Sequence, residues 1–270
     1  MGRYNSRVTY GLFLLIFLVA PITVLLMVLW RQLRRHHWLA MALVSIIAFV
    51  YTTPWDNYAA YKGLWTFAPE FVWGPPFWFG WLPLEEYLFY FAEAIFTCLA
   101  MVALAQTPLW KPEKEAAGKP EAKTPQPALP PLPLAGVLAP LPFGKLSYLL
   151  ILWLWALPVL AVQWVVARRS LWRARWLLLA TLLLCGTYLS LADHFAIAKG
   201  IWQIQEEGIV GWRLQGHLPL EEAMFFYLTV AMSAQGFWMI AEHFREKWEA
   251  KEGRVLSNAQ HTPEAKGEAH

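Results

Sequence analysis

The chain has 270 residues, of which 58% are hydrophobic and only 15% are charged. Soluble domains carry about 25% charged residues, so this composition indicates an integral membrane protein rather than an ordinary soluble domain. The formal net charge of +3 is too small to suggest nucleic-acid binding. The only two cysteines, Cys98 and Cys185, fall inside apolar runs, so neither a disulfide framework nor a metal site is expected.

Apolar segments in six places approach the roughly 20 residues that a helix needs to cross the hydrocarbon of a bilayer. They are residues 10–30, 38–53, 84–106, 147–167, 174–192 and 218–241. Arg3 and Arg7 precede the first segment as they would in a signal peptide, but no small-x-small cleavage site follows before Arg31. We therefore expect a retained first span and a multi-pass protein of the cell membrane.

The segment between the third and fourth spans, residues 107–146, is a proline-rich linker. Ten prolines lie between Pro108 and Pro142, so regular helix is not expected through most of it. The linker begins charged and ends apolar, and its apolar part at 128–143 is a candidate for an extra membrane crossing. Residues 242–270 form a polar tail, for which we expect a brief helix beside the membrane and then disorder.

An internal repeat divides the chain into two halves. The stretch "WDNYAAYKGLW" begins at Trp55 and "ADHFAIAKGIW" begins at Ala192, and "LPLEE" occurs at Leu82 and again at Leu218. The two blocks recur in the same order at offsets of 137 and 136 residues, which indicates a duplication. The sequence thus predicts an all-α integral membrane protein made of two homologous three-helix repeats, residues 1–106 and 147–241, with six to seven transmembrane helices.

The distribution of Lys and Arg bears on the number of crossings. An Arg-rich turn follows the first span of each half, "RQLRRHHW" and "RRSLWRARW". With six spans the halves would be inverted and the basic residues would divide almost evenly between the two faces. A seventh crossing at 128–143 would make the halves parallel and place both Arg turns in the cytoplasm, as the positive-inside rule favours. The prolines of 128–143 argue against a regular crossing helix, and we favour seven crossings.

Acidic residues recur near the ends of the predicted spans in both halves. Because charged groups in a membrane are costly, they are candidates for catalysis; they are Asp56, Glu85, Glu86, Asp193, Glu221 and Glu222. A helix-capping role is the alternative for one Glu of each pair, since acids in a first turn complement the helix dipole. Adjacent helical residues point about 100° apart, so the other Glu of each pair can face the bundle.

One helix face carries polar groups deeper into the membrane in the first half only. Glu86, Tyr90 and Glu93 recur at helical spacing, whereas the equivalent face of the second half has a single acid, followed by Phe226 and Thr229. The two halves are therefore not chemically equal.

Aromatic residues surround the acids in both loops, including Trp65 and Trp202. A simple interfacial belt is one reading. The other is a chamber whose rings stabilise carbocations while excluding water. His194, next to Asp193, is a candidate proton relay, although an interfacial histidine without such a role is the more common case. Acids and aromatic walls within a membrane suggest carbocation chemistry on a lipid-soluble polyene.

At these residues the sequence resembles the non-flavin lycopene cyclase family, in its fused two-repeat form. The family's Pro-x-Glu-Glu/Asp motif is matched by Pro83–Glu86 and Pro219–Glu222, and the resemblance covers residues 10–106 and 147–241. It implies conversion of an acyclic carotenoid end into a six-membered ring without net redox change and without a cofactor. The chain contains no G-x-G-x-x-G dinucleotide fingerprint, which agrees with a cofactor-free reaction.

Together with the resemblance, the inward helix faces of Glu86 and Glu222 suggest roles for the acids. We expect Glu86 and Glu222 to donate protons, and their neighbours Glu85 and Glu221 to stabilise the cation or accept a proton, with the roles inside each pair open to exchange. Asp56 and Asp193 complete the catalytic candidates. Contacts to the substrate are expected from the remaining candidates, Trp65, Tyr90, Glu93, His194 and Trp202.

The expected partners are lycopene or a related acyclic carotenoid and the lipid bilayer, with other carotenoid-pathway enzymes as further candidates and no nucleic acid. Two other functions fit the same residues. A hydratase would capture the same cation with water, and a proton-coupled transporter would also use repeated three-span units with acids. The sequence leaves open the ring isomer, the number of cyclised ends and whether there are one or two active sites.

Overall fold

The computed structural model describes residues 8–73, 80–108 and 147–260. Within these residues it contains six helical segments that are long and apolar enough to cross a membrane. The predicted all-α membrane architecture is therefore confirmed. The spans are Tyr10–Leu29, Arg35–Tyr61, Leu84–Gln106, Tyr148–Arg173, Arg175–Lys199 and Leu220–Ala250.

The helices and strands follow a similar order in both halves, except that β3 and β4 have no counterpart among the described residues of the first half. The first half contains α1 (Tyr10–Leu14), the π-helical turn η1 (Leu15–Val19), α2 (Ala20–Leu29), α3 (Arg35–Tyr61), β1 (Trp65–Phe67), η2 (Pro69–Phe71) and α4 (Leu84–Gln106). The second half contains α5 (Ser147–Arg173), α6 (Arg175–Lys199), β2 (Trp202–Ile204), η5 (Glu206–Gly208), β3 (Arg213–Leu214), β4 (Leu218–Pro219) and α7 (Leu220–Gln260).

The second span is longer than the sequence pattern predicted. The prediction ended it at residue 53, just before Pro54, but α3 continues through this proline to Tyr61. Side chains bind backbone carbonyl groups around the break: Thr53 Oγ1 donates to the carbonyl of Phe49, and Asn57 Nδ2 donates to that of Thr53. Such bonds make a proline tolerable inside a membrane helix. The catalytic candidate Asp56 consequently lies on a helix and not in a loop.

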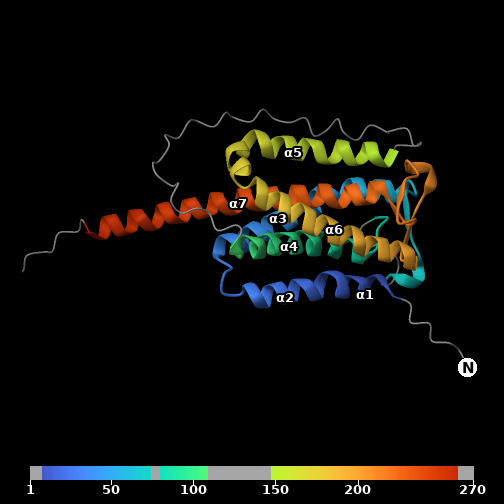
Figure 1. Cartoon of the computed structure of the whole chain (residues 1–270), viewed down its shortest axis with the longest axis horizontal. Helices are drawn as coiled ribbons and strands as arrows, with labels where there is room; N and C mark the ends of the chain where they lie inside the picture. Colours follow the sequence, from blue (N-terminus) through green and yellow to red (C-terminus); the bar gives the residue numbers. More distant parts are fainter. Residues whose placement is uncertain (1–7, 74–79, 109–146, 261–270) are drawn as a thin grey trace, which may run out of the picture.

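The two halves lie parallel in the bundle. In Figure 1, α1 and α5 both begin at the end where β1 and β2 lie, and α4 ends at the opposite end. This parallel arrangement is the one that a seventh crossing would produce. Residues 128–143 lie outside the described residues, so the extra crossing stays a prediction.

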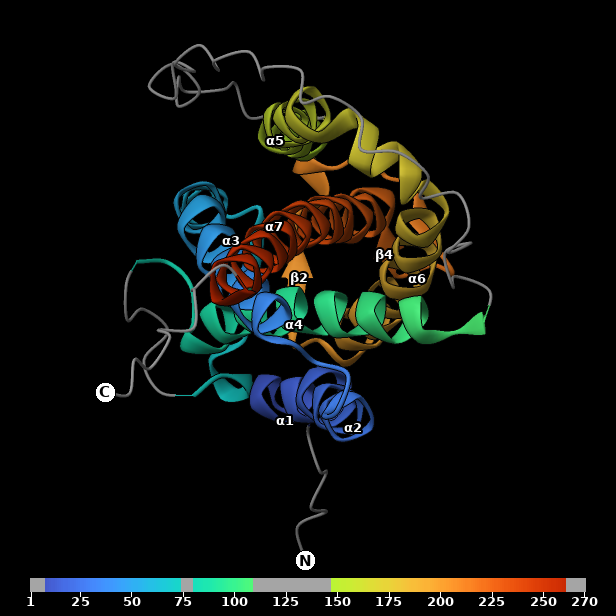
Figure 2. The ribbon, with the colours of Figure 1, turned by 90° about the vertical axis from the view of Figure 1, so that its left-hand side faces the viewer.

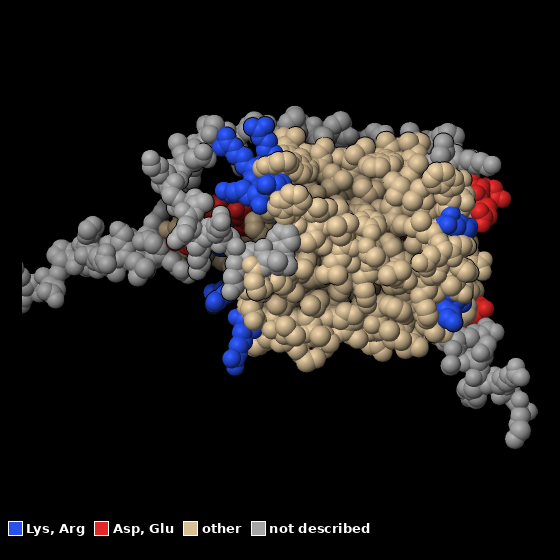
Figure 3. All heavy atoms as spheres, in the orientation of Figure 1, with Lys and Arg blue, Asp and Glu red and all other residues tan. Residues whose placement is uncertain are grey.

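The two ends of the bundle differ in charge. Figure 3 shows an uncharged band around the middle of the bundle, with Lys and Arg gathered mainly at one end. We call this the arginine end; it holds the turns with Arg31, Arg34 and Arg35 and with Arg168–Arg175. The opposite end, with β1 and β2, is called the strand end. The positive-inside rule predicts that the arginine end faces the cytoplasm.

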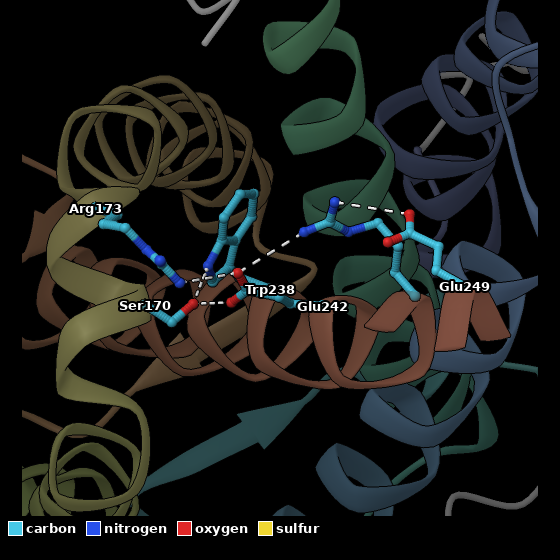
Figure 4. Close-up of polar contacts among 6 residues, drawn as sticks. Ser170, Arg173, Trp238, Glu242 and Glu249 are labelled. Carbon is cyan, nitrogen blue, oxygen red and sulfur yellow. Dashed lines mark hydrogen bonds and ion pairs between the residues drawn. The ribbon is translucent and has the colours of Figure 1, made fainter. Parts of the chain in front are cut away.

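A polar cluster holds α5 against α7 at the arginine end (Figure 4). Ser170 donates to Glu242, and Trp238 Nε1 donates to Ser170 Oγ at 2.8 Å. Arg173 lies 3.2 Å from Glu242, but the Arg173 side chain is 71% exposed. Because exposed ion pairs contribute little, the bonds through Ser170 are the main stabilising contacts.

A short antiparallel sheet joins the halves at the strand end. Strand β1 of the first half pairs with β2 of the second, with Thr66 opposite Gln203. The chain reaches these strands through equivalent glycines, Gly63 and Gly200, with φ of 75° and 73°. Residues with a Cβ rarely adopt this backbone conformation, which accounts for the glycine that follows the lysine in both repeats.

Candidate active site

Carboxyl groups from both halves meet in one cavity of about 50 Å³ near the strand end. Asp56 on α3 and Glu86 on α4 come from the first half, and Asp193 on α6 and Glu222 on α7 from the second. Aromatic side chains form the rest of the lining; they are Tyr10, Trp55, Trp65, Phe67, Phe89, Tyr148, Trp202, Phe225 and Phe226. The arrangement is a single chamber to which both repeats contribute.

Each cavity glutamate is held by a tyrosine from the first span of its own half. The Tyr10 hydroxyl donates to Glu86 Oε2 at 2.8 Å, and the Tyr148 hydroxyl donates to Glu222 Oε1 at 2.7 Å. The first turns of α4 and α7 place these glutamates at the strand end, where a helix starts readily after a proline. The second oxygen of each carboxyl group is left for other contacts.

The sequence reasoning missed Tyr10 and Tyr148. Both tyrosines are about 1% exposed and each stands at or next to the start of the first span of its half. They lie 138 positions apart, close to the offset of the repeated blocks. Extending the repeat alignment upstream to the first spans would have identified them.

The two cavity aspartates have different partners. Tyr90 donates its hydroxyl to Asp56 Oδ2, whereas Asp193 Oδ1 accepts from Trp202 Nε1 at 2.8 Å. Both aspartates are buried, at 4% and 1% exposure. The predicted contact residues Tyr90 and Trp202 are thus brought to the catalytic candidates.

The predicted contact residues Trp65 and Trp202 line the cavity from the two strands, and each packs on the opposite half. The Trp65 ring lies 5.4 Å from Tyr148, and the Trp202 ring lies 4.9 Å from Tyr10. Because these tyrosines hold the cavity glutamates, each half supplies a wall for the other half's acid.

The first glutamate of each pair lies outside the cavity lining. Glu85 Oε1 accepts from the backbone N–H of Trp73 at 2.5 Å, and Glu221 Oε1 accepts from that of Val210 at 2.6 Å. Both side chains are completely buried. These bonds attach the loop of each half to the start of its third span, which supports a positioning role for Glu85 and Glu221.

Two further candidates also lie outside the cavity lining. Glu93 is buried about two helical turns beyond Glu86 along α4, and it lines a second cavity between the helices. His194 is partly exposed at the strand end, with its ring 5.3 Å from that of His217.

The electrostatics of the cavity follow from its lining. Asp56, Asp193 and Glu222 are buried and Glu86 is partly buried, and the described residues of the lining include neither Lys nor Arg. Four carboxyl groups in one low-dielectric space cannot all be ionised, because each negative charge raises the cost of the next. A cluster of this kind therefore contains protonated carboxyl groups, which can exchange their protons, next to ionised ones. Within the described residues, no cluster of His, Cys, Asp and Glu is arranged to hold a metal ion.

Buried carboxyl groups thus face aromatic rings among helices that are long and apolar enough to cross a membrane. The chain is 34% identical over 213 residues to a protein named lycopene beta-cyclase from Halobacterium salinarum (strain ATCC 29341 / DSM 671 / R1), a match that covers 74% of this chain and 83% of the relative. This chain belongs to the lycopene cyclase family.

Fungal relatives match over a similar part of the chain. Bifunctional lycopene cyclase/phytoene synthase from Podospora anserina is 30% identical over 220 residues, which is 77% of this chain but 36% of that protein. The Phaffia rhodozyma protein of the same name is 30% identical over 221 residues, 73% of this chain and 31% of its own length. The chain thus spans about a third of each fungal protein. No family model and no solved structure matches the chain.

Proposed function

We propose that this protein cyclises the acyclic ends of lycopene or a related carotenoid to β-type rings, within a cell membrane. The observation that carries the proposal is the meeting of the acids of both repeats in one aromatic cavity among membrane helices. The name lycopene beta-cyclase, carried by the Halobacterium salinarum relatives, favours the β ring. The relatives' names do not favour a hydratase or a transporter.

The reaction needs one proton in and one proton out. A carboxylic acid protonates the terminal double bond of the acyclic end, which gives a tertiary carbocation. A double bond further along the chain attacks this centre, closes the six-membered ring and moves the cation into the ring. A carboxylate then removes a proton from a neighbouring carbon, so the product is an isomer of the substrate.

Glu86 and Glu222 are the proposed proton donors. In each, one carboxyl oxygen accepts a hydrogen bond from a tyrosine, Tyr10 or Tyr148, which fixes the group while its other oxygen can face the substrate. The paired aspartates, Asp56 and Asp193, are the proposed acceptors of the proton that leaves. The tryptophan and phenylalanine rings of the lining stabilise the cation through their quadrupoles and keep water away from it.

One shared site explains the geometry better than two separate ones. The lining draws acids from both halves, and each half's tryptophan packs on the tyrosine that holds the other half's glutamate. A bicyclic product therefore requires two successive visits to the same cavity. The uncharged band between the two ends of the bundle supports the lipid bilayer as the surroundings (Figure 3). Association with other carotenoid-pathway enzymes stays a prediction.

The test is turnover of lycopene by the purified protein in liposomes, without added flavin or nicotinamide. In D₂O each ring formed should gain one deuterium from the donor and lose one hydrogen, which mass spectrometry of the separated pigments detects. The double variant Glu86→Gln/Glu222→Gln is the matched control. A product that carries the mass of added water would replace the proposal with a hydratase, and an absolute need for reduced flavin would overturn the mechanism.

A further inference from the structure

A second cavity of about 260 Å³ lies between α3, α4, α5 and α7. Its floor is a stripe of α7 with helical spacing, made of Phe225, Thr229, Met232, Ser233, Gly236, Met239 and Ile240. At 1.5 Å per residue the stripe is about 22 Å long, and it runs from the acid cavity toward the arginine end. We call this cavity the α7 groove.

The α7 groove lies between two helices that face lipid. In Figure 2, α5 lies above α7 and α3 lies to its left. Outside the groove, α3 exposes Val50 at 62% and α5 exposes Leu157 at 51%, as expected for residues in contact with lipid chains. Most of the groove lining is apolar, and Gln163 on α5 has its amide nitrogen bonded to the carbonyl of Met232 at 2.9 Å.

Aromatic side chains form the partition between the α7 groove and the acid cavity. Phe225 lines both spaces, and Tyr90, which lines the groove, donates to Asp56 in the acid cavity. Trp155 lines the groove and stacks on Phe225 at 5.9 Å, and Trp55 of the acid cavity lies 5.1 Å from Trp155. Aromatic rings therefore lie between the two spaces.

The volumes decide which space can hold a long ligand. A cavity of about 150 Å³ accommodates a benzene molecule, so the acid cavity, at about 50 Å³, is too small for a cyclising chain end while its rings stay in place. The α7 groove, at about 260 Å³, has room for a slender chain. A substrate end that reaches the acids must displace the partition of Trp155 and Phe225.

The corresponding place in the other half is filled. By the repeat offset, Met232 and Gly236 of α7 correspond to Phe96 and Ala100 of α4. Phe96 is buried, with its ring 5.1 Å from that of Tyr188 on α6. The larger side chains of α4 occupy the room that the smaller ones of α7 leave open, so the two faces are unequal.

From this geometry we infer that the α7 groove binds the polyene chain of the substrate, which enters from the bilayer between α3 and α5. This inference rests on the proposed cyclase function. The polyene then lies along α7, across the membrane, with one end past the Trp155–Phe225 partition and the other near the arginine end. Only one end can react in each binding event. The monocyclic product must leave and return reversed before the second ring forms.

The test is a graded series at Gly236, the smallest residue of the groove floor. A Cβ built there lies 3.4 Å from Gln163 Nε2 and 3.7 Å from Val44 Cγ2, which are ordinary contacts, so Gly236→Ala should be tolerated. Gly236→Leu and Gly236→Phe would fill the groove progressively. Val165→Phe on the lipid face of α5, where the side chain is 65% exposed, adds comparable bulk outside the groove and is the matched control.

The first measurement is binding without turnover. In the Glu86→Gln/Glu222→Gln background, the amount of lycopene that stays with the purified protein should fall about tenfold or more with Gly236→Phe, a loss equivalent to at least about 1.4 kcal/mol. Val165→Phe should retain lycopene as the unsubstituted background does, and Gly236→Ala should lose less lycopene than Gly236→Phe.

The second measurement uses the otherwise unaltered protein with two substrates, lycopene and a shortened polyene with the same acyclic end. Gly236→Phe should slow the turnover of lycopene and spare that of the short substrate, and in wild type the monocyclic product should appear free before the bicyclic one. Equal retention of lycopene across the series would overturn the groove assignment. If Gly236→Phe does not yield folded protein, Gly236→Leu carries the same test, and a folded Gly236→Leu that retains as much lycopene as the background also overturns the assignment. Failure of wild type to cyclise lycopene would instead overturn the proposed function.

Discussion

The two halves of the molecule hold their glutamates in the same way but their aspartates differently. The tyrosine–glutamate bonds are 2.8 Å in the first half and 2.7 Å in the second. In contrast, Asp56 accepts from Tyr90 of its own half's third span, and Asp193 accepts from Trp202 on the joining strand. The two halves thus share the hydrogen bonds to the proposed proton donors and differ in the hydrogen bonds to the proposed proton acceptors. The α7 groove also lies on the side of the acid cavity where Asp56 is found, because Tyr90, the partner of Asp56, lines the groove.

The largest effect is expected from removing the acids that the halves share. Glu86→Gln/Glu222→Gln should abolish turnover, and at least one single variant should lose about 100-fold or more, the usual order for a general acid. The two single variants should differ because the substrate approaches from one side only. Initial rates in liposomes measure this, with detergent-solubilised yield and helical content as the control for folding. Near wild-type turnover by a folded double variant would remove both residues from the mechanism.

The partners of the aspartates should come next. Tyr90→Phe and Trp202→Phe each leave a buried carboxyl group without its donor. The lower part of the usual loss, about 1–1.5 kcal/mol, corresponds to roughly fivefold to tenfold in turnover if these bonds orient the proton acceptors. Trp202→Phe should cost more, because its ring also packs on Tyr10. The ratio of monocyclic to bicyclic pigment, measured with the rates, checks the order. Equal and negligible effects would mean that the aspartates need no orientation.

The first glutamate of each pair should affect stability rather than chemistry. Glu85→Ala and Glu221→Ala remove the acceptor of the loop N–H of Trp73 and of Val210. Loss of a part-buried hydrogen bond costs about 1 kcal/mol, so thermal unfolding should occur at lower temperature. Turnover per folded molecule should stay within a few-fold of wild type. A drop as large as that of the neighbouring glutamates would return Glu85 or Glu221 to the catalytic group.

The smallest effect is expected at a pair of bonds between the halves. Tyr51 donates to the carbonyl of Trp155, and its repeat equivalent Tyr188 donates to that of Phe17, each at 2.9 Å. Tyr51→Phe and Tyr188→Phe should each lower the free energy of unfolding by about 1 kcal/mol, measured by denaturant titration in detergent. Similar values would confirm that the frame is symmetric, and only Tyr51→Phe should alter the retention of lycopene, because Tyr51 lines the α7 groove.

The repeat made much of the fold predictable. Apolar length predicted the six spans, and the two LPLEE blocks predicted the acids at the starts of α4 and α7, because these features depend on local sequence. Helical spacing also selected Glu86 and Glu222 as the acids that face the bundle, and both line the cavity. Contacts between the halves were not predictable in this way. The packing of Trp65 on Tyr148 does not follow from spacing, because it depends on how the two halves pack against each other.

The pairing of β1 with β2 has a consequence for the order of folding. Thr66 and Gln203 are partners although they stand 137 positions apart, so this contact closes a very long loop and forms late. During synthesis the first half emerges with its strand edge unpaired and its acids facing only their own tyrosine and aspartate. The joining strand delivers Trp202, and with it the second wall of the chamber. A nascent chain is consequently inactive until its last span has been inserted, and maturation of the enzyme is a single event at the end of biogenesis.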